Sequence, residues 1–432
     1  MRKTLIFLIG CLFPLIVAPA PIGRKQAMYT AREYLSAHGK ILKAESLAFK
    51  APRKDASSAE NAYYYVFNVG DDNGYVIVSG DDRTDQILGY VETGTFDEEN
   101  IPDNMRSWLQ LYADQIKYLD DHNIQIDRRA VKAHRVSQTR HAVAPLMKSK
   151  WNQGSPYNNR CPVYYDAQGN SGTSVSGCVA TALAQVINFY KYPVATTAAI
   201  PSHTNTYSTP TGTRTVRLNS ISKGAKIDWD NMCDTYSGSE TEDQKKAVAD
   251  LMLYVGQAVK MGYGASSAAG FGDNIPAVMT KYFGFDDAVT MEYRNKYSID
   301  GWFNLIYNEI ASKHPVAMSG SSSGGAHAFV LDGFDGENLF HVNWGWGGGS
   351  DGYFLLQILN PGDSSGAGAS TSSDGYSMGQ DVLIGLNYPD DVKVESNMAL
   401  TINDIVVNGL TIEGNFINGQ VPQGLIAVVL SG

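Results

Sequence analysis

The stretch GCVATALAQVINFY, residues 177–190, decides the fold class of this chain. It follows a loop rich in Ser, Gly and Thr, which is typical of a helix start. The helix is expected to end before Pro193, because the residue that precedes a proline avoids the helical conformation. Apolar side chains occupy nearly every face of this helix, so we expect it to be buried at the centre of a domain.

Cys178 is predicted to open this helix. The backbone N–H groups of a first turn lack helical partners and the helix dipole is positive there, so the position favours a thiolate. A free cysteine is also commonly a small, inert core residue. The stretch alone leaves both interpretations open, a nucleophile and a core residue.

The composition restricts the class of protein. The chain has 432 residues and a formal net charge of -10, with 43 glycines, 25 tyrosines and 18% charged residues. The length suggests two or three domains. The negative charge argues against a nucleic-acid-binding protein, which normally carries a basic face. The composition indicates a β-rich protein with many loops.

Residues 1–20 are predicted to be a secretory signal peptide, with a charged start, an apolar run and an A-x-A-like end at residues 18–20. The apolar run is too short for a transmembrane anchor. Residues 8–11 resemble a lipoprotein box, but the apolar run continues beyond Cys11, which argues against lipidation there. We therefore expect a secreted or surface-associated protein.

Residues 21–140 are predicted to form a small α+β unit without an acid/base pair, a metal-ligand spacing or a phosphate loop. Its expected elements are a helix over 25–38, strands over 63–69, 75–79 and 86–91, and a helix that begins at Asp103. Basic residues then crowd a segment of little apolar periodicity, which indicates an exposed linker open to proteolysis: Arg128, Arg129, Lys132, Arg135 and Arg140.

The second half of a candidate site lies in the strand-rich part of the chain after Pro315. His327 begins an alternating run that ends at Phe334, and Asp335-Gly336 is a strong signal for a two-residue hairpin turn. Counting back from such a turn places His327 directly across from Trp344.

The same register sets two further residues apart from His327. Asn343 would lie across from Ala328 and point to the other face of the hairpin, and His341 would lie on the face opposite His327. The register thus selects one histidine of the hairpin as the candidate, provided that no bulge shifts the pairing.

The order of the two residues, with Cys178 first and His327 roughly 150 residues downstream, is that of papain-like enzymes. Considered alone, His327 is more readily interpreted as a half-buried strand residue, and it becomes a catalytic candidate through the cysteine helix and the register with Trp344. The rival serine-hydrolase motif G-x-S-x-G occurs at residues 320–324, but that motif needs a following helix and here a strand follows. No H-E-x-x-H or C-x-x-C occurs, so we expect no metal and no cofactor.

Several separated segments resemble the streptopain family of secreted bacterial cysteine peptidases, and its longer interpain-like members in particular. The resemblance covers about residues 147–387, and the strands within 68–82 resemble the family's inhibitory propeptide. The segments that carry it are Trp151–Gly154, Gly177–Ala182, Met261–Ser267, Gly325–Val330 and His341–Gly348.

The resemblance implies an α+β papain-like peptidase with a central buried helix and an antiparallel sheet. It assigns residues 21–140 to an inhibitory propeptide and 141–390 to the peptidase domain. Residues 391–432 form a β-rich segment, expected to have strands over 398–402, 405–407 and 425–430; we interpret it as the start of a truncated domain or a lone extension. The implied activity is that of a latent endopeptidase acting on protein and peptide substrates.

The resemblance also implies residue roles. Cys178 corresponds to the nucleophile and His327 to the general base that later acts as an acid. Gln153 would complete an oxyanion hole with the Cys178 N–H, and Trp344 would orient the imidazole, with Asn343 in a supporting role only. Residues resembling the substrate-pocket wall are Tyr263, Ser266, Ser267 and Gly325.

Two alternatives remain open at this point. An inactive papain-like binding or adhesion protein would be expected to lack Cys178, His327 or Gln153, and all three are present. In an exported protein Cys161 and Cys233 can form a disulfide and leave Cys178 free, but the sequence does not show this pairing.

Overall fold

The computed structural model describes residues 21–43, 46–53, 61–122, 140–297, 299–322, 325–356, 379–387, 402–407 and 410–416. The expected signal peptide 1–20, the lipid-box cysteine Cys11 and the basic linker up to Arg135 lie outside these residues. The chain divides into two compact units, residues 1–387 and 388–432.

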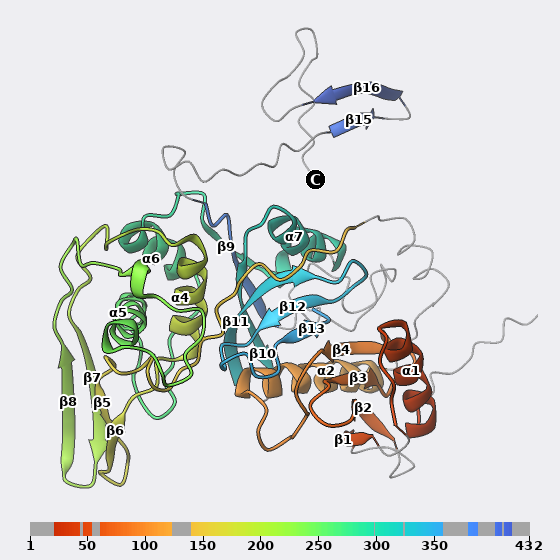
Figure 1. Cartoon of the computed structure of the whole chain (residues 1–432), viewed down its shortest axis with the longest axis horizontal. Coiled ribbons are helices and arrows are strands. Elements are labelled where there is room, and N and C mark those ends of the chain that lie inside the picture. The colour runs from red at the N-terminus through yellow and green to blue at the C-terminus, as the bar shows by residue number, and fades with distance from the viewer. Residues whose placement is uncertain are drawn as a thin grey trace, which may run out of the picture. The chain divides into compact units, whose positions relative to one another are not determined.

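Ten antiparallel strands of the first unit form one sheet (Figure 1). These strands are β1 (Leu47–Pro52), β2 (Ala62–Asn68), β3 (Tyr75–Ser79), β4 (Ile87–Val91), β9 (Thr290–Tyr293), β10 (Val316–Ser322), β11 (Gly325–Phe334), β12 (Phe340–Asn343), β13 (Gly352–Phe354) and β14 (Gln380–Ile384). Their order across the sheet is β1-β2-β3-β4-β13-β12-β11-β10-β14-β9. Two separate hairpins join β5 (Val163–Tyr165) to β6 (Ser171–Thr173) and β7 (His203–Thr209) to β8 (Gly212–Leu218).

The helices are α1 (Arg24–Ala37), α2 (Asp103–Asp121), α4 (Cys178–Tyr190), α5 (Glu242–Ala258), α6 (Asn274–Phe283) and α7 (Ile299–Ala311), with 3-10 turns η1 (Trp229–Asn231) and η2 (Arg294–Lys296). The α5 helix starts at a capping box, in which Thr241 Oγ1 accepts from the Gln244 N–H and the Gln244 side chain accepts from the Thr241 N–H. These bonds satisfy N–H groups that have no partner inside the helix.

The α+β fold class is confirmed, and so are the predicted helices and strands of the N-terminal part. The α1, α2, β2, β3 and β4 elements lie within one or two residues of their expected bounds. The sequence analysis missed β1 and β13, which are short or only half buried and therefore give little periodic signal.

The N-terminal strands continue the sheet of the later part of the chain. At the seam β4 pairs with β13, so that Tyr90 lies opposite Tyr353 and Gly89 opposite Phe354. A Cβ on Gly89 would lie 2.7 Å from the Phe354 ring, so only a glycine allows this close approach. The two parts of the first unit are therefore joined by backbone pairing as well as by side-chain packing.

The two faces of the sheet are covered by different helices. On one face Trp108 of α2 packs edge-on against Phe329 of β11, with ring centroids 5.3 Å apart. On the other face Gln185 of α4 bonds to Asn343, which pairs with Val330, the neighbour of Phe329. Since successive strand residues point to opposite faces, α2 and α4 lie on opposite sides of β11.

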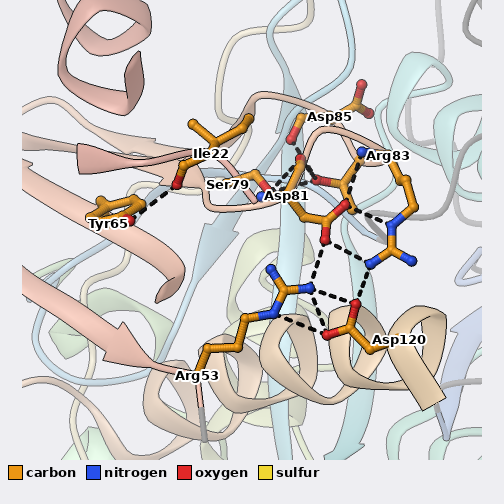
Figure 2. A network of polar contacts seen from close by, with 9 residues as sticks. Ile22, Arg53, Tyr65, Ser79, Asp81, Arg83, Asp85 and Asp120 are labelled. Atoms are coloured by element: carbon orange, nitrogen blue, oxygen red, sulfur yellow. Dashed lines mark hydrogen bonds and ion pairs between the residues drawn. The ribbon is translucent and has the colours of Figure 1, made fainter. Parts of the chain in front are cut away.

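A charge network fixes α2 to the N-terminal strands (Figure 2). Asp81, which follows β3, binds Arg53 at 2.9 Å and Arg83 at 2.7 Å, and both guanidinium groups also bind Asp120 near the end of α2. Burial would raise the pKa of Asp81, but its hydrogen bonds with Arg83 outweigh this and leave the pKa below its usual value. The stabilisation is therefore present above the ordinary carboxyl pKa and is lost only as the pH falls through the lowered one.

The predicted two-residue turn between β11 and β12 is wrong. Phe334 pairs with Phe340, because the Asp335 carboxylate accepts the N–H groups of the three residues 337–339 and organises a wider loop. A bulge between Leu331 and Gly333 then shifts the pairing back by one residue. Asn343 consequently lies opposite Val330 and not opposite Ala328.

The net displacement of two residues has one important consequence. Trp344 does not lie directly across from His327, since the register continues to Phe329, whose ring centroid is 5.0 Å from that of Trp344. The faces are unchanged by an even shift, so Trp344 stays on the His327 side and Asn343 on the other.

In the second unit the structure describes one hairpin, made of β15 (Ile402–Val407) and β16 (Leu410–Phe416). The expected strand over 405–407 is confirmed as part of β15. The expected strand over 425–430 and most of that over 398–402 lie outside the described residues.

Candidate active site

Cys178 is the first residue of α4, as the sequence predicts. The preceding Gly177 has a φ of 87°, which side chains rarely adopt, and a Cβ there would lie 2.8 Å from the Met261 side chain. Glycine thus allows the loop to turn sharply into the helix with the cysteine at its tip.

The surroundings of Cys178 favour the thiol over the thiolate. Burial raises its pKa above the usual value, and the N–H groups of Ala328, Val179 and Cys178 itself offset this only in part. The helix N-terminus, which by itself favours a thiolate, is therefore outweighed by the loss of solvent. The bond from Ala328 places the sulfur beside β11, one residue away from His327.

His327 is half-buried on the α2 side of the sheet. It pairs with Gly320 of β10, and a Cβ on Gly320 would lie 2.8 Å from the Trp108 ring, so both residues face α2. Burial lowers the pKa of His327, although the charge of Asp103 at the start of α2 acts in the opposite direction. Burial therefore favours the neutral form of the imidazole, which faces α2.

Cys178 of α4 and His327 of β11 lie on adjacent elements, since the sulfur is bound by the backbone of Ala328. Within the described part of the chain, no hydrogen bond or ion pair joins the His327 ring to the Cys178 sulfur. Both pKa shifts favour the uncharged forms, a thiol and a neutral imidazole. A thiolate–imidazolium pair is not favoured in this arrangement.

Gln153 lies beside the loop that leads into Cys178. Its carbonyl oxygen accepts the Ser176 N–H at 3.0 Å, and its own N–H is bound by the Asn152 side chain at 2.6 Å. The bond to Ser176 holds the Gln153 backbone beside the chain two residues before Cys178. The half-buried side chain is thereby attached close to the start of α4.

Trp344 is buried and is contacted by residues of α2. Its carbonyl oxygen accepts from the Asn104 side chain of α2, and its ring lies among those of Trp108, Phe329 and Phe354. The Trp344 N–H donates to the Asp351 carboxylate at 2.9 Å. Burial raises the pKa of Asp351 to about 7, so this carboxyl titrates near neutrality.

The four residues assigned to the substrate-pocket wall lie in different surroundings. Tyr263 and Ser267 are buried, and Ser267 Oγ donates to the Val175 carbonyl at 2.6 Å, which braces the loop before Cys178. Ser266 is exposed, and Gly325 begins β11. Of the three assigned residues in this loop, Ser266 is thus the one whose side chain is open to solvent.

The structure adds residues that the sequence analysis did not single out. Asn104 contacts the Trp344 backbone, and Gln185 connects α4 to Asn343. Gln185 lies on the same helix face as Cys178, a polar residue in an apolar helix, and that contrast was the available signal. No sequence signal connects Asn104 with Trp344, because their contact depends on how α2 packs.

The remaining groups to consider in the described part of the chain are its thiols and its possible metal ligands. Cys161, Cys178 and Cys233 are all free thiols, and burial raises the pKa of Cys161 to about 12. Among the described residues, no group of three or more His, Cys, Asp or Glu side chains could hold a metal ion.

Comparison with known proteins identifies both halves of the first unit. The sequence model of the Peptidase C10 family matches residues 151–354, and that of the Spi protease inhibitor matches residues 19–116. Streptopain of Streptococcus pyogenes is 35% identical over 339 residues, which cover 76% of this chain and 81% of that protein.

Two further relatives are longer or structurally characterised. The thiol protease/hemagglutinin PrtT of Porphyromonas gingivalis is 30% identical over 392 residues, covering 89% of this chain and 43% of that protein. A solved fragment of Prevotella intermedia prointerpain A matches with a TM-score of 0.60 and 31% identity, over 79% of this chain and 99% of the fragment. The chain therefore belongs to the Peptidase C10 family, the streptopain family of cysteine peptidases.

Proposed function

We propose that the chain is the latent precursor of a secreted cysteine endopeptidase in which Cys178 is the nucleophile and His327 the general base. The observation that carries this assignment is the position of Cys178 at the start of α4, with its sulfur beside the backbone of Ala328 and therefore next to His327. The family membership and the Spi-type N-terminal region support the same conclusion.

The proposed chemistry follows from these residue types. The His327 imidazole takes the proton of the Cys178 thiol, and the thiolate attacks the peptide carbonyl. The oxyanion that forms accepts hydrogen bonds from the Cys178 N–H and the Gln153 side chain. The imidazolium then protonates the leaving amine, and water hydrolyses the resulting thioester. Trp344 orients the imidazole, and Ser266 and Gly325 contact the substrate.

Latency is proposed to arise from the position of α2. The helix faces His327, and its Asn104 holds the Trp344 backbone. While α2 stays in place the imidazole cannot turn to the thiol, and both groups remain neutral. Removal of residues 21–122 is expected to release His327 and Trp344 together, which is why a single cleavage can activate the enzyme.

The cleavage is proposed to fall upstream of Val143. Arg140 Nη2 donates to Asn304 Oδ1 at 2.6 Å, and Val143 and Phe334 exchange two backbone hydrogen bonds of 2.8 Å. Backbone that is paired in this way is not free to enter the active site of a peptidase. The basic residues before Arg140 are the better substrate for processing.

Export is proposed to depend on residues 1–20, with proteins and peptides as the substrates. In the part of the chain that the structure describes, none of the helices combines the length and apolar character needed to cross a bilayer.

A paired substitution tests the proposed nucleophile. Cys178→Ala is expected to abolish casein hydrolysis and to accumulate as an uncut precursor that starts near Pro21, and a trace of active enzyme should then trim it. The matched control is Cys233→Ala, which removes another partly exposed thiol and should leave activity and maturation unchanged. Casein hydrolysis by the Cys178→Ala protein at the wild-type rate would refute the assignment.

A further inference from the structure

We infer that Gln185 and Asn343 are positioning residues for the oxyanion hole: together they fix the segment 149–153 that carries Gln153. The inference rests on the proposed role of Gln153. It gives Asn343, which lies on the α4 side of the sheet, a task different from orienting the imidazole.

Gln185 links the catalytic helix to this segment. It follows Cys178 by two helical turns on the same face of α4, and its side chain is fully buried. Its Oε1 accepts the Trp151 N–H at 3.2 Å, and its Nε2 donates to Asn343 Oδ1 at 3.0 Å. Gln185 thus spans the gap between the segment and the end of β12.

Asn343 holds the same segment from the sheet. Its side chain is 3% exposed, and its Nδ2 donates to the Ser149 carbonyl at 2.8 Å. Its Oδ1 accepts from Gln185 and also from the Gly345 N–H at 3.0 Å. The amide therefore ties the segment to the turn that follows Trp344.

The bonds around the segment leave its backbone little freedom to rotate. Besides the two amides, the Trp151 carbonyl accepts the Gly347 N–H at 2.8 Å, and the Gln153 carbonyl accepts the Ser176 N–H at 3.0 Å. Hydrogen bonds are directional, so buried amides fix an orientation that apolar contacts of the same size leave free. The orientation fixed here is that of Gln153 relative to the Cys178 N–H.

The reaction offers a readout that separates positioning from general stability. The oxyanion forms in peptide hydrolysis but not when iodoacetamide alkylates the thiolate, although both reactions use the same nucleophile. A misplaced oxyanion donor therefore lowers kcat while leaving KM and the alkylation rate of Cys178 unchanged.

The test is a double-mutant cycle on the processed enzyme. Gln153→Ala is expected to lower kcat by about 10²–10³-fold. Gln185→Met should lower kcat by about tenfold in the wild type but by less than about twofold in the Gln153→Ala protein, because a donor that is absent cannot be misplaced. KM and the rate of Cys178 alkylation should stay near their wild-type values in both single variants.

A matched control measures how the loss of a buried glutamine outside the proposed site changes stability and activity. Gln257 of α5 is 3% exposed and donates to the carbonyl groups of Pro201 and Asn219 at 2.7 and 2.8 Å. Gln257→Met is expected to lower the melting temperature as Gln185→Met does, but to leave kcat unchanged. If Gln185→Met does not fold, Asn343→Ser takes its place in the cycle.

The outcomes distinguish a failure of the positioning role of Gln185 and Asn343 from a failure of the oxyanion role of Gln153. Equal losses of kcat from Gln185→Met in both backgrounds, or no loss at all, overturn the positioning role and leave Gln153 as the donor. An unchanged kcat in Gln153→Ala refutes the oxyanion role of Gln153 in the proposed function, and the positioning role fails with it.

Discussion

At the scale of single residues, burial has the largest effect on the pKa values of Cys178 and His327. Cys178 stands at a helix N-terminus, where a thiolate is favoured, yet its surroundings raise the pKa of the thiol. His327 is affected in the complementary way, since burial lowers the pKa of its imidazole. The residues of the proposed pair could be chosen from the sequence, but their protonation could not, because it depends on the chain packed around them.

The same reasoning predicts the pH dependence of stability at Asp351. Burial raises the pKa of this carboxyl to about 7, so the folded protein retains a proton that the unfolded chain loses near pH 4. The contribution of Asp351 to the free energy of unfolding is therefore largest below about pH 4 and decreases as the pH rises from 4 to 7. Asp351→Asn keeps an acceptor for the Trp344 N–H without the buried charge.

We expect Asp351→Asn to raise the melting temperature at pH 8 relative to the unsubstituted protein, by about 2–4 °C for each kcal/mol gained, and to give a clearly smaller increase at pH 5, where only part of the range between the unfolded and the folded pKa has been crossed. The measurement is thermal unfolding at the two pH values in the Cys178→Ala background, which prevents self-digestion. The exposed Asp287→Asn serves as the control. A difference that is the same at both pH values would show that Asp351 is not held protonated.

At the scale of secondary-structure elements, the N-terminal part is attached through one strand and one helix. The seam between β4 and β13 requires Gly89, because a Cβ there would lie 2.7 Å from the Phe354 ring. Trp108 and Tyr112 of α2 complete the seam by hydrogen bonds to the Leu355 carbonyl at 3.2 and 2.7 Å. A bulky residue at the seam should therefore separate the inhibitory part from the peptidase.

Gly89→Val is expected to weaken this attachment by about 1–3 kcal/mol, the usual cost of overpacking. The precursor should then show a higher activity on a small peptide substrate before any cleavage. Gly23→Ala is the matched control, since a Cβ on Gly23 meets no atom within 4 Å. Activity of the uncut Gly89→Val precursor no higher than that of the Gly23→Ala precursor would contradict a role of the seam in latency.

The elements also show where prediction from the sequence stops. The α4 helix follows from local signals, namely an apolar run between a glycine and a proline. The β11–β12 register does not, because the Asp335 carboxylate widens the turn and the bulge beside Asp332 moves the pairing back. Bulges and side-chain–backbone bonds of this kind depend on three-dimensional partners. The predicted faces of Trp344 and Asn343 are correct only because the wider turn and the bulge together shift the pairing by an even number of residues.

At the scale of the whole molecule, the first unit places an inhibitor-like part against a peptidase in one continuous sheet. The sequence indicates both parts, but it does not reveal β13 or its pairing with β4. That pairing joins residues more than 250 positions apart, and strand pairing at such distances leaves no local pattern. We propose as the consequence for function that the first four strands and α2 must be removed before His327 can turn away from the α2 side.

The most direct test of this account is the rate at which iodoacetamide alkylates Cys178 at pH 6, measured by mass spectrometry before and after the precursor is processed. In the precursor the raised pKa favours the less reactive thiol, whereas in the processed enzyme the freed imidazole is expected to form a thiolate–imidazolium pair. The account predicts a rate increase of at least about tenfold on processing, since the larger thiolate fraction outweighs the lower nucleophilicity. Equal rates in the two forms would contradict it.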